Sequence, residues 1–244
     1  MNLEQKATAL RELINKSRKL CLFTGAGISV PSGIPDFRSA DGIYSKNYKR
    51  NLRPEEIISH SFFVRDPEMF YDFYRNKMIY PQAKPNAAHR YFADLEKAGK
   101  NVYVVTQNID GLHQAAGSSG VMELHGSIHR NYCTSCSRYY GGIKCITDAD
   151  GVPKCECGGI IKPDVVLYEE GLDDNVVSRA LDAISTSDLM IVVGTSLAVY
   201  PAASFIRYFR GDNLVLINKS STDYDSSANL VINADIIDVV NLLK

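Results

Sequence analysis

The sequence predicts an α/β fold in which a doubly wound parallel sheet carries a smaller lobe built from two insertions. Short apolar runs that are typical of buried strands alternate with segments of helical periodicity along most of the chain. Several of these runs end in glycine or polar clusters, as strands do where ligands bind in open α/β sheets. Residues 39–85 and 128–160 interrupt the alternation. We therefore assign 1–38, 86–127 and 161–244 to a sheet domain, and the two interruptions to a helical insertion and a cysteine-rich module.

The first elements are a helix and a strand that leads into a glycine turn. Apolar residues recur at helical spacing over residues 3–17, which predicts an amphipathic packing helix. The apolar run Leu20–Phe23 predicts a buried strand that ends in the turn Gly25–Gly27, where backbone N–H groups can approach a pyrophosphate closely. The sheet domain is thus expected to be Rossmann-like. Residues 54–80 then predict two short helices with a break near residues 65–67.

The later elements repeat the pattern of strands and helices. Asn86 is a suitable N-cap, which predicts a helix over 86–98 that leads into a buried strand at 101–105. A short strand at 121–124 follows and ends at His125. Beyond the cysteines we expect, in order, strand 164–168, helix 173–186, strand 188–193, helix 201–210, strand 213–217, strand 230–232 and helix 235–243.

Composition limits the classes of function. With 45% hydrophobic and 23% charged residues the chain has an ordinary globular composition, and its formal net charge of -1 gives no electrostatic case for a nucleic-acid or membrane partner. The basic residues between Lys46 and Arg53 are interpreted as a solvated loop. No apolar run approaches the ~20 residues that span a bilayer, and the polar N-terminus is unlike a signal peptide. We therefore expect a soluble, cytoplasmic protein.

Cysteine spacing predicts a structural zinc site. Cys133 and Cys136 form one chelating pair and Cys155 and Cys157 another, and four thiolates suit tetrahedral zinc without an open coordination position. The second pair has one intervening residue where two are usual, which still allows chelation. Cys145 is interpreted as a spare thiol that could compete as a ligand. This clustering favours a metal over disulfides.

The glycine turn taken alone leaves two interpretations open. It lacks the third glycine of a dehydrogenase fingerprint, because Val30 stands at that position. An acidic residue at the end of a second strand about 20 residues on, which that fingerprint requires, is also missing. The turn could therefore bind a dinucleotide or serve only close packing between a strand and a helix.

The five histidines do not carry equal weight as functional candidates. His60 and His89 fall within helical patterns and are interpreted as packing or surface residues, and His129 borders the cysteine region. His113 follows the polar cluster after the second strand and could be either structural or functional. His125 stands at a strand end, where an imidazole with a pKa of ~7 could take a proton from a bound ligand. Position alone leaves catalysis and structure equally open for His125.

Taken together, these stretches resemble the sirtuins of bacterial type, members of the Sir2 family of NAD-dependent protein lysine deacylases. The resemblance extends over essentially the whole chain. The matched motifs follow the family order: Gly25–Ser29, Gly33–Arg38, Thr106–Asp110, Leu124–Gly126, the two cysteine pairs, Lys162–Val166, Gly194–Ser196 and Asn218.

The resemblance implies an enzyme that consumes NAD as a co-substrate and carries one structural zinc ion on the four paired cysteines. Members cleave the bond between nicotinamide and ribose and release nicotinamide, O-acyl-ADP-ribose and free lysine. The implied catalytic residues are His125, which deprotonates a ribose hydroxyl, and Asn108, which orients the ribose together with Gln107. Asp110 would bind the carboxamide. The implied cofactor-binding residues are Gly25, Ala26, Gly27, Ser29, Asp36, Phe37, Arg38, Gln107, Asn108, Asp110, Gly194, Thr195, Ser196, Asn218, Lys219 and Ile236.

Two details of that implied site concern the phosphates and the ribose. The N–H groups of Gly25–Gly27, the side chain of Arg38 and the hydroxyl of Ser29 are expected to hold the phosphates. Phe37 is expected to shield the ribose after nicotinamide leaves, and the loop 39–44 is expected to move with it.

The resemblance also implies a protein or peptide substrate that carries an acylated lysine. The peptide is expected to pair by its backbone with residues 163–168 on one side and 194–200 on the other, which implies a loose preference for flanking side chains. Phe37, Val166 and Tyr168 are the implied substrate contacts and line, with His125, an apolar tunnel for the lysine stem.

The implied acyl group is uncharged. Relatives that prefer succinyl or malonyl groups carry a Tyr-x-x-Arg pair in the helical insertion, and the matching residues here are Tyr74 and Lys77. Lysine offers a charge but not the bidentate fork that binds a carboxylate, so acetyl and other uncharged groups are favoured. Glu169 is a further departure, because many relatives have glycine before the glutamate that matches Glu170.

Three other functions are alternatives to deacylation as an interpretation of the sequence. Mono-ADP-ribosyl transfer would use the same cleavage of NAD with another nucleophile. A module that only senses NAD would need a broken site, whereas His125, Asn108 and Asp110 are all present. A hydride-transfer dehydrogenase is disfavoured by the missing ribose-binding acid.

Overall fold

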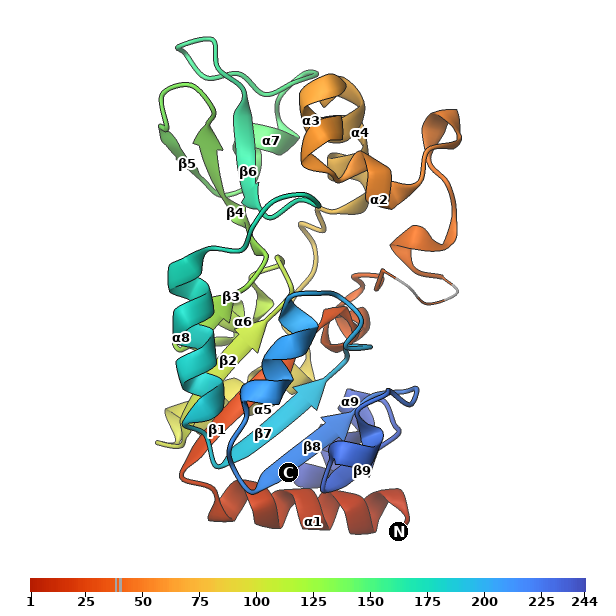
Figure 1. The fold of residues 1–244 in the computed structure, drawn as a ribbon, viewed down its shortest axis with the longest axis vertical. Helices are drawn as coiled ribbons and strands as arrows, with labels where there is room; N and C mark the ends of the chain where they lie inside the picture. The colour runs from red at the N-terminus through yellow and green to blue at the C-terminus, as the bar shows by residue number, and fades with distance from the viewer. Residues whose placement is uncertain (38, 40) are drawn as a thin grey trace.

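The computed structural model describes residues 1–37, 39 and 41–244. Figure 1 shows a parallel sheet with its helices in the lower part of the view and the two insertions in the upper part. Both chain termini lie at the end of the sheet domain that is remote from the small lobe. Among the described residues, no helix combines the length and the apolar character needed to cross a membrane.

The main sheet has six parallel strands, and its order is that of a doubly wound dinucleotide-binding fold. The order is β3-β2-β1-β7-β8-β9, so the chain builds outward from β1 in one direction and then from β7 in the other. The predicted fold class is therefore confirmed. The strands are β1 Lys19–Thr24, β2 Asn101–Thr106, β3 Val121–Glu123, β7 Leu189–Val193, β8 Asn213–Ile217 and β9 Leu230–Ile232.

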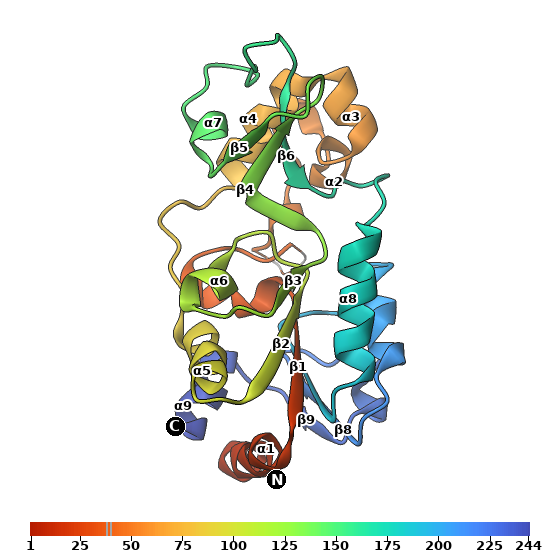
Figure 2. The ribbon, with the colours of Figure 1, turned by 90° about the vertical axis from the view of Figure 1, so that its left-hand side faces the viewer.

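Helices cover both faces of this sheet, which explains why its strands read as continuous apolar runs. Leu20 and Leu22 pack on one face against α1 Leu3–Lys16, α5 Ala87–Lys97 and α9 Ile236–Leu243. Cys21 and Phe23 point to the other face, where α8 Asp174–Ser185 and the 3-10 helix η5 Ala202–Tyr208 lie. Figure 2 shows these two layers on opposite sides of the sheet, with the short helix α6 Leu112–Ala116 beside β3.

The segment expected to form a helix over 201–210 is instead η5. Its backbone bonds span three residues, as from the Ser204 N–H to the Pro201 carbonyl at 3.0 Å. Apolar spacing of three to four residues is shared by the two helix types, so the sequence pattern does not separate them. The other 3-10 helices are η1 Ala26–Ile28, η2 Val30–Ser32, η3 Ile43–Ser45, η4 Lys49–Asn51 and η6 Asp225–Ser227.

Residues 54–80 of the helical insertion form three α-helices where two were expected. They are α2 Pro54–Ile57, α3 His60–Arg65 and α4 Pro67–Lys77. Ser59 and Asp66 each accept a bond from a backbone N–H of the following helix, so each starts a new helix. Lys49 and Arg50 form exposed ion pairs with Asp72 and Asp66, which confirms the interpretation of this basic stretch as a solvated loop.

The cysteine-rich module contains a small antiparallel sheet that the sequence pattern did not reveal. Its strands lie in the order β5-β4-β6, with β4 Gly126–Cys133, β5 Tyr139–Gly141 and β6 Ile161–Val165, and α7 Lys144–Thr147 follows β5. The strand expected at 164–168 in the main sheet was wrong. The chain leaves the main sheet after β3, and β4 then pairs with residues 161–165 in the sheet of the small lobe.

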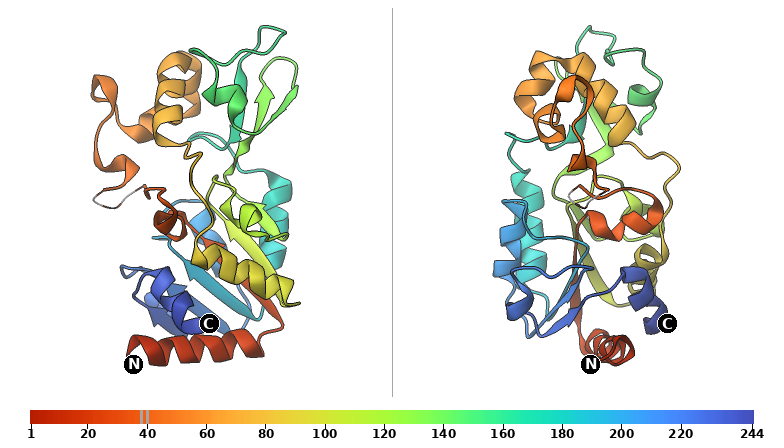
Figure 3. Two further views of the ribbon diagram at one scale, coloured as in Figure 1. Left: turned by 180° about the vertical axis from the view of Figure 1, so that it is seen from behind. Right: turned by 90° about the vertical axis from the view of Figure 1, so that its right-hand side faces the viewer.

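The two insertions share one hydrophobic core. Side chains of α2, α3 and α4 pack with Ile128, Cys133, Cys155 and Ile161 of the cysteine-rich module. Figure 3 shows the helices and the small sheet side by side at the end of the molecule away from the chain termini. The cysteines therefore anchor the helical insertion as well as their own loops.

Two histidines are buried side by side in the sheet domain. The rings of His89 and His113 lie 4.8 Å apart, and both side chains are buried. Burial lowers the pKa of His89 to about 4 and the pKa of His113 to about 3. His113 Nε2 lies 3.1 Å from Thr24 Oγ1 inside the core, which favours the structural interpretation of His113.

Acid should destabilise the fold through these two histidines. Each imidazole is neutral in the folded state and gains a proton in the unfolded chain below its ordinary pKa, so stability present at pH 7 is lost as the pH falls. We expect a loss on the order of 1–2 kcal/mol per histidine by a pH of about 5, measured as the free energy of unfolding in urea. His113→Phe should flatten this pH dependence relative to the half-exposed His60→Gln; equal slopes would contradict the prediction.

Candidate active site and metal centre

A first cavity lies where the strand order of the main sheet reverses. It has a volume of ≈ 380 Å³ and opens at the carboxyl ends of β1, β7 and β8. The turns after these strands line it with Gly25–Gly27, Gly194–Ser196 and Asn218–Thr222. We name it the glycine cavity.

The glycines of this cavity allow two strand ends to approach each other. A Cβ atom at Gly25 would meet Thr195 Cβ at 2.6 Å, and one at Gly27 would meet Gly194 Cα at 2.6 Å. The N–H groups of Gly25 and Gly27 donate to the carbonyls of Val193 and Gly194 at 3.0 and 2.8 Å. Because these N–H groups are already bonded, the expectation that they hold phosphate is corrected. Gly25 and Gly27 instead serve close packing, the second of the two roles that the sequence left open for this turn.

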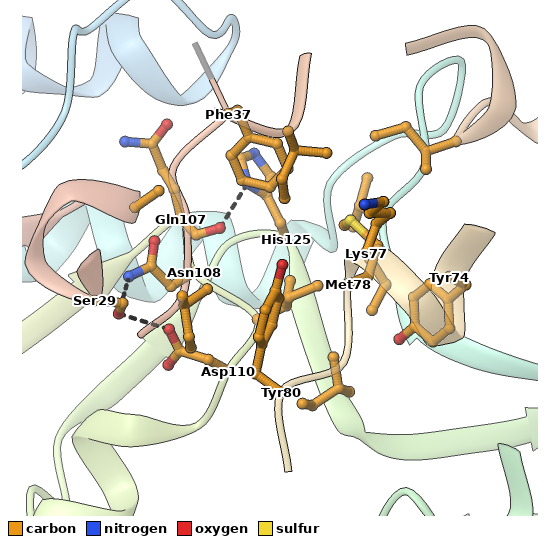
Figure 4. A pocket seen from close by; sticks show the side chains of 18 of the residues that line it. Ser29, Phe37, Tyr74, Lys77, Met78, Tyr80, Gln107, Asn108, Asp110 and His125 are labelled. Carbon is orange, nitrogen blue, oxygen red and sulfur yellow. Dashed lines mark hydrogen bonds between the residues drawn. The ribbon is translucent and has the colours of Figure 1, made fainter. Parts of the chain in front are cut away.

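A second cavity lies between the sheet domain and the small lobe. It has a volume of ≈ 390 Å³, and we name it the aromatic cavity after the phenylalanine and tyrosine rings that line it, Phe37, Tyr44, Tyr74, Tyr80, Tyr168 and Tyr200. The ring centroids of Phe37 and Tyr44 are 5.2 Å apart, and the hydroxyls of Tyr44 and Tyr168 are 3.3 Å apart. Figure 4 shows Phe37 and Tyr80 on either side of the space in front of His125.

The two cavities meet at a small set of shared residues. Residues that line both are Ala26, Phe37, Gln107, Asn108, His125 and Val199. Ala26 closely follows β1, and Gln107 and Asn108 follow β2. His125 lies where the chain leaves β3 for the small lobe. A ligand in one cavity can therefore reach a ligand in the other beside an imidazole and a carboxamide.

The ring of His125 is held in one orientation. Its Nδ1 lies 2.9 Å from the carbonyl oxygen of Gln107, as Figure 4 shows, and a carbonyl only accepts, so Nδ1 carries the proton. The Nε2 lone pair is then free to accept a proton. Burial lowers the pKa of His125, while the bond to Gln107 opposes that shift in part. The imidazole is therefore a neutral base at pH 7.

A hydrogen-bonded chain connects the turn after β1 to the loop after β2. Asn108 Nδ2 donates to the Gly25 carbonyl and to Ser29 Oγ, each at 3.1 Å, and the Ser29 hydroxyl donates to Asp110 Oδ2 at 2.7 Å (Figure 4). Ser29 is buried and lines the aromatic cavity rather than the glycine cavity. The phosphate-binding role expected for Ser29 is corrected, because its hydroxyl is directed to Asp110. Burial raises the pKa of Asp110.

Glu169 and Glu170 tie the segment after β6 to the helical insertion. Glu169 has a φ of 76°, a left-handed conformation that favours glycine, and its carboxylate accepts bonds from the Ser61 N–H at 2.8 Å and the Ser61 hydroxyl at 2.9 Å. Glu170 accepts from the Leu167 N–H at 2.9 Å and pairs with His60 at 2.8 Å. The bonds at the start of α3 offset the strain that glycine avoids in many relatives.

The four paired cysteines form one cluster. The thiols of Cys133, Cys136, Cys155 and Cys157 all lie within 4.8 Å of one another, and two of the sulfur–sulfur distances are 3.4 and 3.7 Å. Thiolates on one tetrahedral zinc ion lie roughly 3.8 Å apart, so the donor set and its size fit zinc. Cys145 lies outside this cluster, with its sulfur 3.8 Å from the Gly142 carbonyl.

Most residues expected at the cofactor do line the glycine cavity. These are Gly25, Ala26, Gly27, Asp36, Phe37, Gln107, Asn108, Gly194, Thr195, Ser196, Asn218, Lys219 and Ile236. Ser29 and Asp110 line the aromatic cavity instead, and Val166 and Tyr168, which were expected as substrate contacts, also line it. Arg38 lies outside the described residues.

The sequence did not predict some of the residues that line the two cavities. Ser220, Ser221 and Thr222 line the glycine cavity directly after Asn218, where the rule of polar strand ends could have found them. Met78 and Tyr80 line the aromatic cavity from the segment after α4. That segment has no motif or periodicity that would single them out.

Because the two cavities share a wall that includes a base, the fold and the site define an enzyme that brings a nucleotide to a second substrate. A family model for the Sir2 family matches residues 25–201. The chain belongs to the Sir2 family.

Similar proteins agree with this assignment. The chain is 58% identical over 236 residues to an NAD-dependent protein deacetylase of Clostridium perfringens, with 96% of each chain covered. It is 44% identical over 239 residues to one of Staphylococcus aureus, again with 96% of each covered. A solved Sir2 structure with a deacetylated p53 peptide and 3'-O-acetyl ADP ribose superposes with a TM-score of 0.87 at 40% identity, covering 97% of this chain and 96% of the other. A Sir2–p53 peptide–NAD+ structure gives 0.83 at 39% identity, covering 99% and 96%.

Proposed function

We propose that this enzyme removes acetyl groups from lysine side chains of proteins and consumes NAD in the reaction. The observation that supports this most directly is the meeting of the two cavities at His125, Asn108 and Phe37. NAD in the glycine cavity and an acetyl-lysine in the aromatic cavity would then have their reacting atoms side by side. The relatives described above are named for this activity.

The glycine cavity suits the polar parts of a dinucleotide. Asn218 Oδ1 accepts a bond from the Thr195 N–H at 2.9 Å, whereas its Nδ2 is buried without a partner among the described residues. A buried donor without a partner costs stability, so a ligand oxygen at this point would relieve that cost. Lys219 is held near the same wall by an ion pair with Asp235 at 2.9 Å.

His125 is proposed as the general base. The imidazole is neutral, its Nδ1–H is fixed on the Gln107 carbonyl, and Nε2 is the atom that would accept a proton from a ribose hydroxyl. With NAD and acyl-lysine as the two substrates, the acyl oxygen would attack the ribose carbon that carries nicotinamide, and nicotinamide would leave. The ribose hydroxyl next to that carbon, activated as His125 takes a proton, would then attack the acyl carbon. Departure of the lysine amine and addition of water would give free lysine and O-acetyl-ADP-ribose. Asn108 and Gln107 would orient the ribose, and Asp110 would bind the carboxamide of nicotinamide.

Zinc is proposed to have a structural role at the four cysteines. All four positions of a tetrahedral ion would be taken by thiolates, so no position would be open for a substrate. The ion would hold the loops of the small sheet and, through the shared core, the helices that line the aromatic cavity.

Backbone pairing with a peptide substrate remains part of the proposal, with a narrower set of partners. The N–H groups of Val166 and Tyr168 already donate to the carbonyls of His125 and Ile58, and the Leu167 N–H donates to Glu170. A peptide could therefore pair only with carbonyls of this segment or with residues 194–200. The cytoplasmic location expected from the sequence stays a prediction.

We expect acetyl peptides to be better substrates than succinyl peptides. Tyr74 is buried in the aromatic cavity, and burial raises the pKa of its hydroxyl, so the ring stays neutral. Lys77 supplies one ammonium group, which binds a carboxylate less well than a guanidinium. Rates should be compared on acetylated and succinylated forms of one peptide. Lys77→Arg should raise the succinyl rate and Lys84→Arg, an exposed control, should not; faster succinyl removal by the unmodified protein would contradict this prediction.

Mass spectrometry of the products tests the proposed function. Incubation with NAD and an acetylated peptide should give free lysine peptide, nicotinamide and O-acetyl-ADP-ribose in equal amounts. ADP-ribosylated peptide without O-acetyl-ADP-ribose would instead indicate ADP-ribosyl transfer. Unchanged NAD would contradict both activities.

A further inference from the structure

Strand β4 carries a bulge where it passes from the sheet domain into the small lobe (Figure 2). Ser127 pairs with Asp164 of β6, and the next pair is Asn131 with Pro163, so Ile128–Arg130 are accommodated within a single step of β6. We name Ile128–Arg130 the β4 bulge. Bulges next to active sites re-aim side chains. Two residues of this one contact the loop after β2, and the third pairs with acids beside the site.

The first two residues of the β4 bulge hold the loop that carries Asp110. The Ile128 N–H donates to the Ile109 carbonyl at 3.0 Å, and His129 Nε2 lies 3.2 Å from the Asp110 carbonyl. The His129 ring packs so closely on Gly111 that a Cβ atom there would lie 2.7 Å from His129 Cδ2. These contacts place the β4 bulge directly against the aromatic cavity.

Arg130, the third residue, bridges two acids from different sheets. Its Nη1 lies 2.6 Å from Glu123 Oε2 at the end of β3, and its Nε lies 2.7 Å from Asp164 Oδ2 in β6. His125 lies two residues beyond Glu123, and Val166 lies two residues beyond Asp164. The Val166 N–H donates to the His125 carbonyl at 3.0 Å, so the two segments that the guanidinium clamps also bond to each other.

The clamp depends on the shape of arginine as well as on its charge. The Glu123 side chain is 6% exposed, and among the described residues its Oε1 is buried without a partner. Without Arg130 this carboxylate would be buried and uncompensated, which is strongly destabilising. A lysine could pair with Glu123, but its single nitrogen would not reach two carboxylates from the directions that Nε and Nη1 now use.

We propose that Arg130 is a positioning residue for the reaction at His125. By clamping Glu123 to Asp164 it fixes the turn that carries His125 against the segment that carries Val166, across the junction of the two lobes. This inference rests on the proposed deacetylase function. Arg130 contacts neither cavity, so its effect acts through the placement of His125 and not through substrate binding.

Variants of Arg130, Glu123 and Asp164 distinguish an effect on the placement of His125 from an effect on stability. Asp164→Asn removes the more exposed carboxylate and leaves the pair of Arg130 with the buried Glu123 intact, so it should fold normally and lower kcat about threefold. Arg130→Met/Glu123→Gln removes the buried carboxylate together with its partner, so thermal stability should be close to that of the unmodified protein, whereas kcat should fall about tenfold or more. KM for NAD and for the acetyl peptide should change less than about twofold in both variants.

Lysine at position 130 supplies the conservative comparison. Arg130→Lys should have an intermediate kcat, because charge is kept and the double contact is lost. If Arg130→Met/Glu123→Gln has both the kcat and the stability of the unmodified protein, the proposal is overturned, because Arg130 would then serve only to neutralise Glu123. Full kcat in Asp164→Asn or in Arg130→Lys would also overturn it. Each assay includes the unmodified protein, and its inactivity would contradict the proposed function rather than the role of Arg130.

Discussion

Replacing His125 with alanine should abolish deacetylation while leaving the fold intact. The side chain is partly exposed to both cavities and makes a single bond to the Gln107 carbonyl, so its removal costs little stability. General-base catalysis contributes about 10²–10⁴-fold, and we expect kcat to fall within that range. The measurement is kcat on an acetylated peptide with saturating NAD, with the melting temperature as the control for folding.

The pH dependence of this rate gives a second measurement on the same residue. Because burial lowers the pKa of His125, the base stays neutral below the pH at which a free imidazole gains its proton. The acidic limb of the kcat profile should therefore lie at a lower pH than an unperturbed histidine would give. An alanine variant that keeps most of its kcat, or an acidic limb above the ordinary range of histidine, would contradict the assignment of His125 as the general base.

Replacing Cys157 with serine should release zinc and unfold the small lobe. The thiol belongs to the four-cysteine cluster, and the folding of structural zinc sites depends on binding energy of about 10–16 kcal/mol. Because Cys133 and Cys155 share a core with α3 and α4, loss of the ion should also expose these helices and the aromatic cavity. We expect deacetylation to be lost with the metal.

Cys145→Ser is the matched control for this substitution. Cys145 lies in the same module but outside the cluster, so the variant should keep one zinc ion per chain and its melting temperature. Hydrogen exchange provides the spatial test: in Cys157→Ser, the amides of α3 and α4 should lose protection while those of β1 and β7 keep it. Retention of zinc, or uniform loss of protection, would contradict a structural role confined to the small lobe.

Three features that sequence pattern did not reveal have one physical origin. Ser29 was assigned to phosphate from its place in the glycine turn, yet its hydroxyl donates to Asp110, a residue far away in the chain. Residues 161–165 have the alternation of a strand, but alternation does not name the sheet that the strand joins. The left-handed backbone of Glu169 is likewise stabilised by a bond from Ser61, which belongs to the helical insertion. Each of these depends on a contact between segments that sequence pattern treats separately.

The sequence by itself determined the parts that local chemistry encodes. Buried strands, N-caps such as Asn86, the glycine turn and the chelating cysteine pairs each follow from residues within one short stretch. The rule that ligands bind at the carboxyl ends of strands then identified most of the candidate site residues from the sequence.

Only the tertiary structure decided how those parts act together. It bonded the N–H groups of Gly25 and Gly27 to the last residue of β7 and to Gly194 after it, held His125 Nδ1 on the Gln107 carbonyl, and placed that imidazole in the lining of both cavities. It also placed Arg130 between acids of two sheets. These features join segments that are far apart in the chain, so they are set by long-range packing and not by the neighbouring residues.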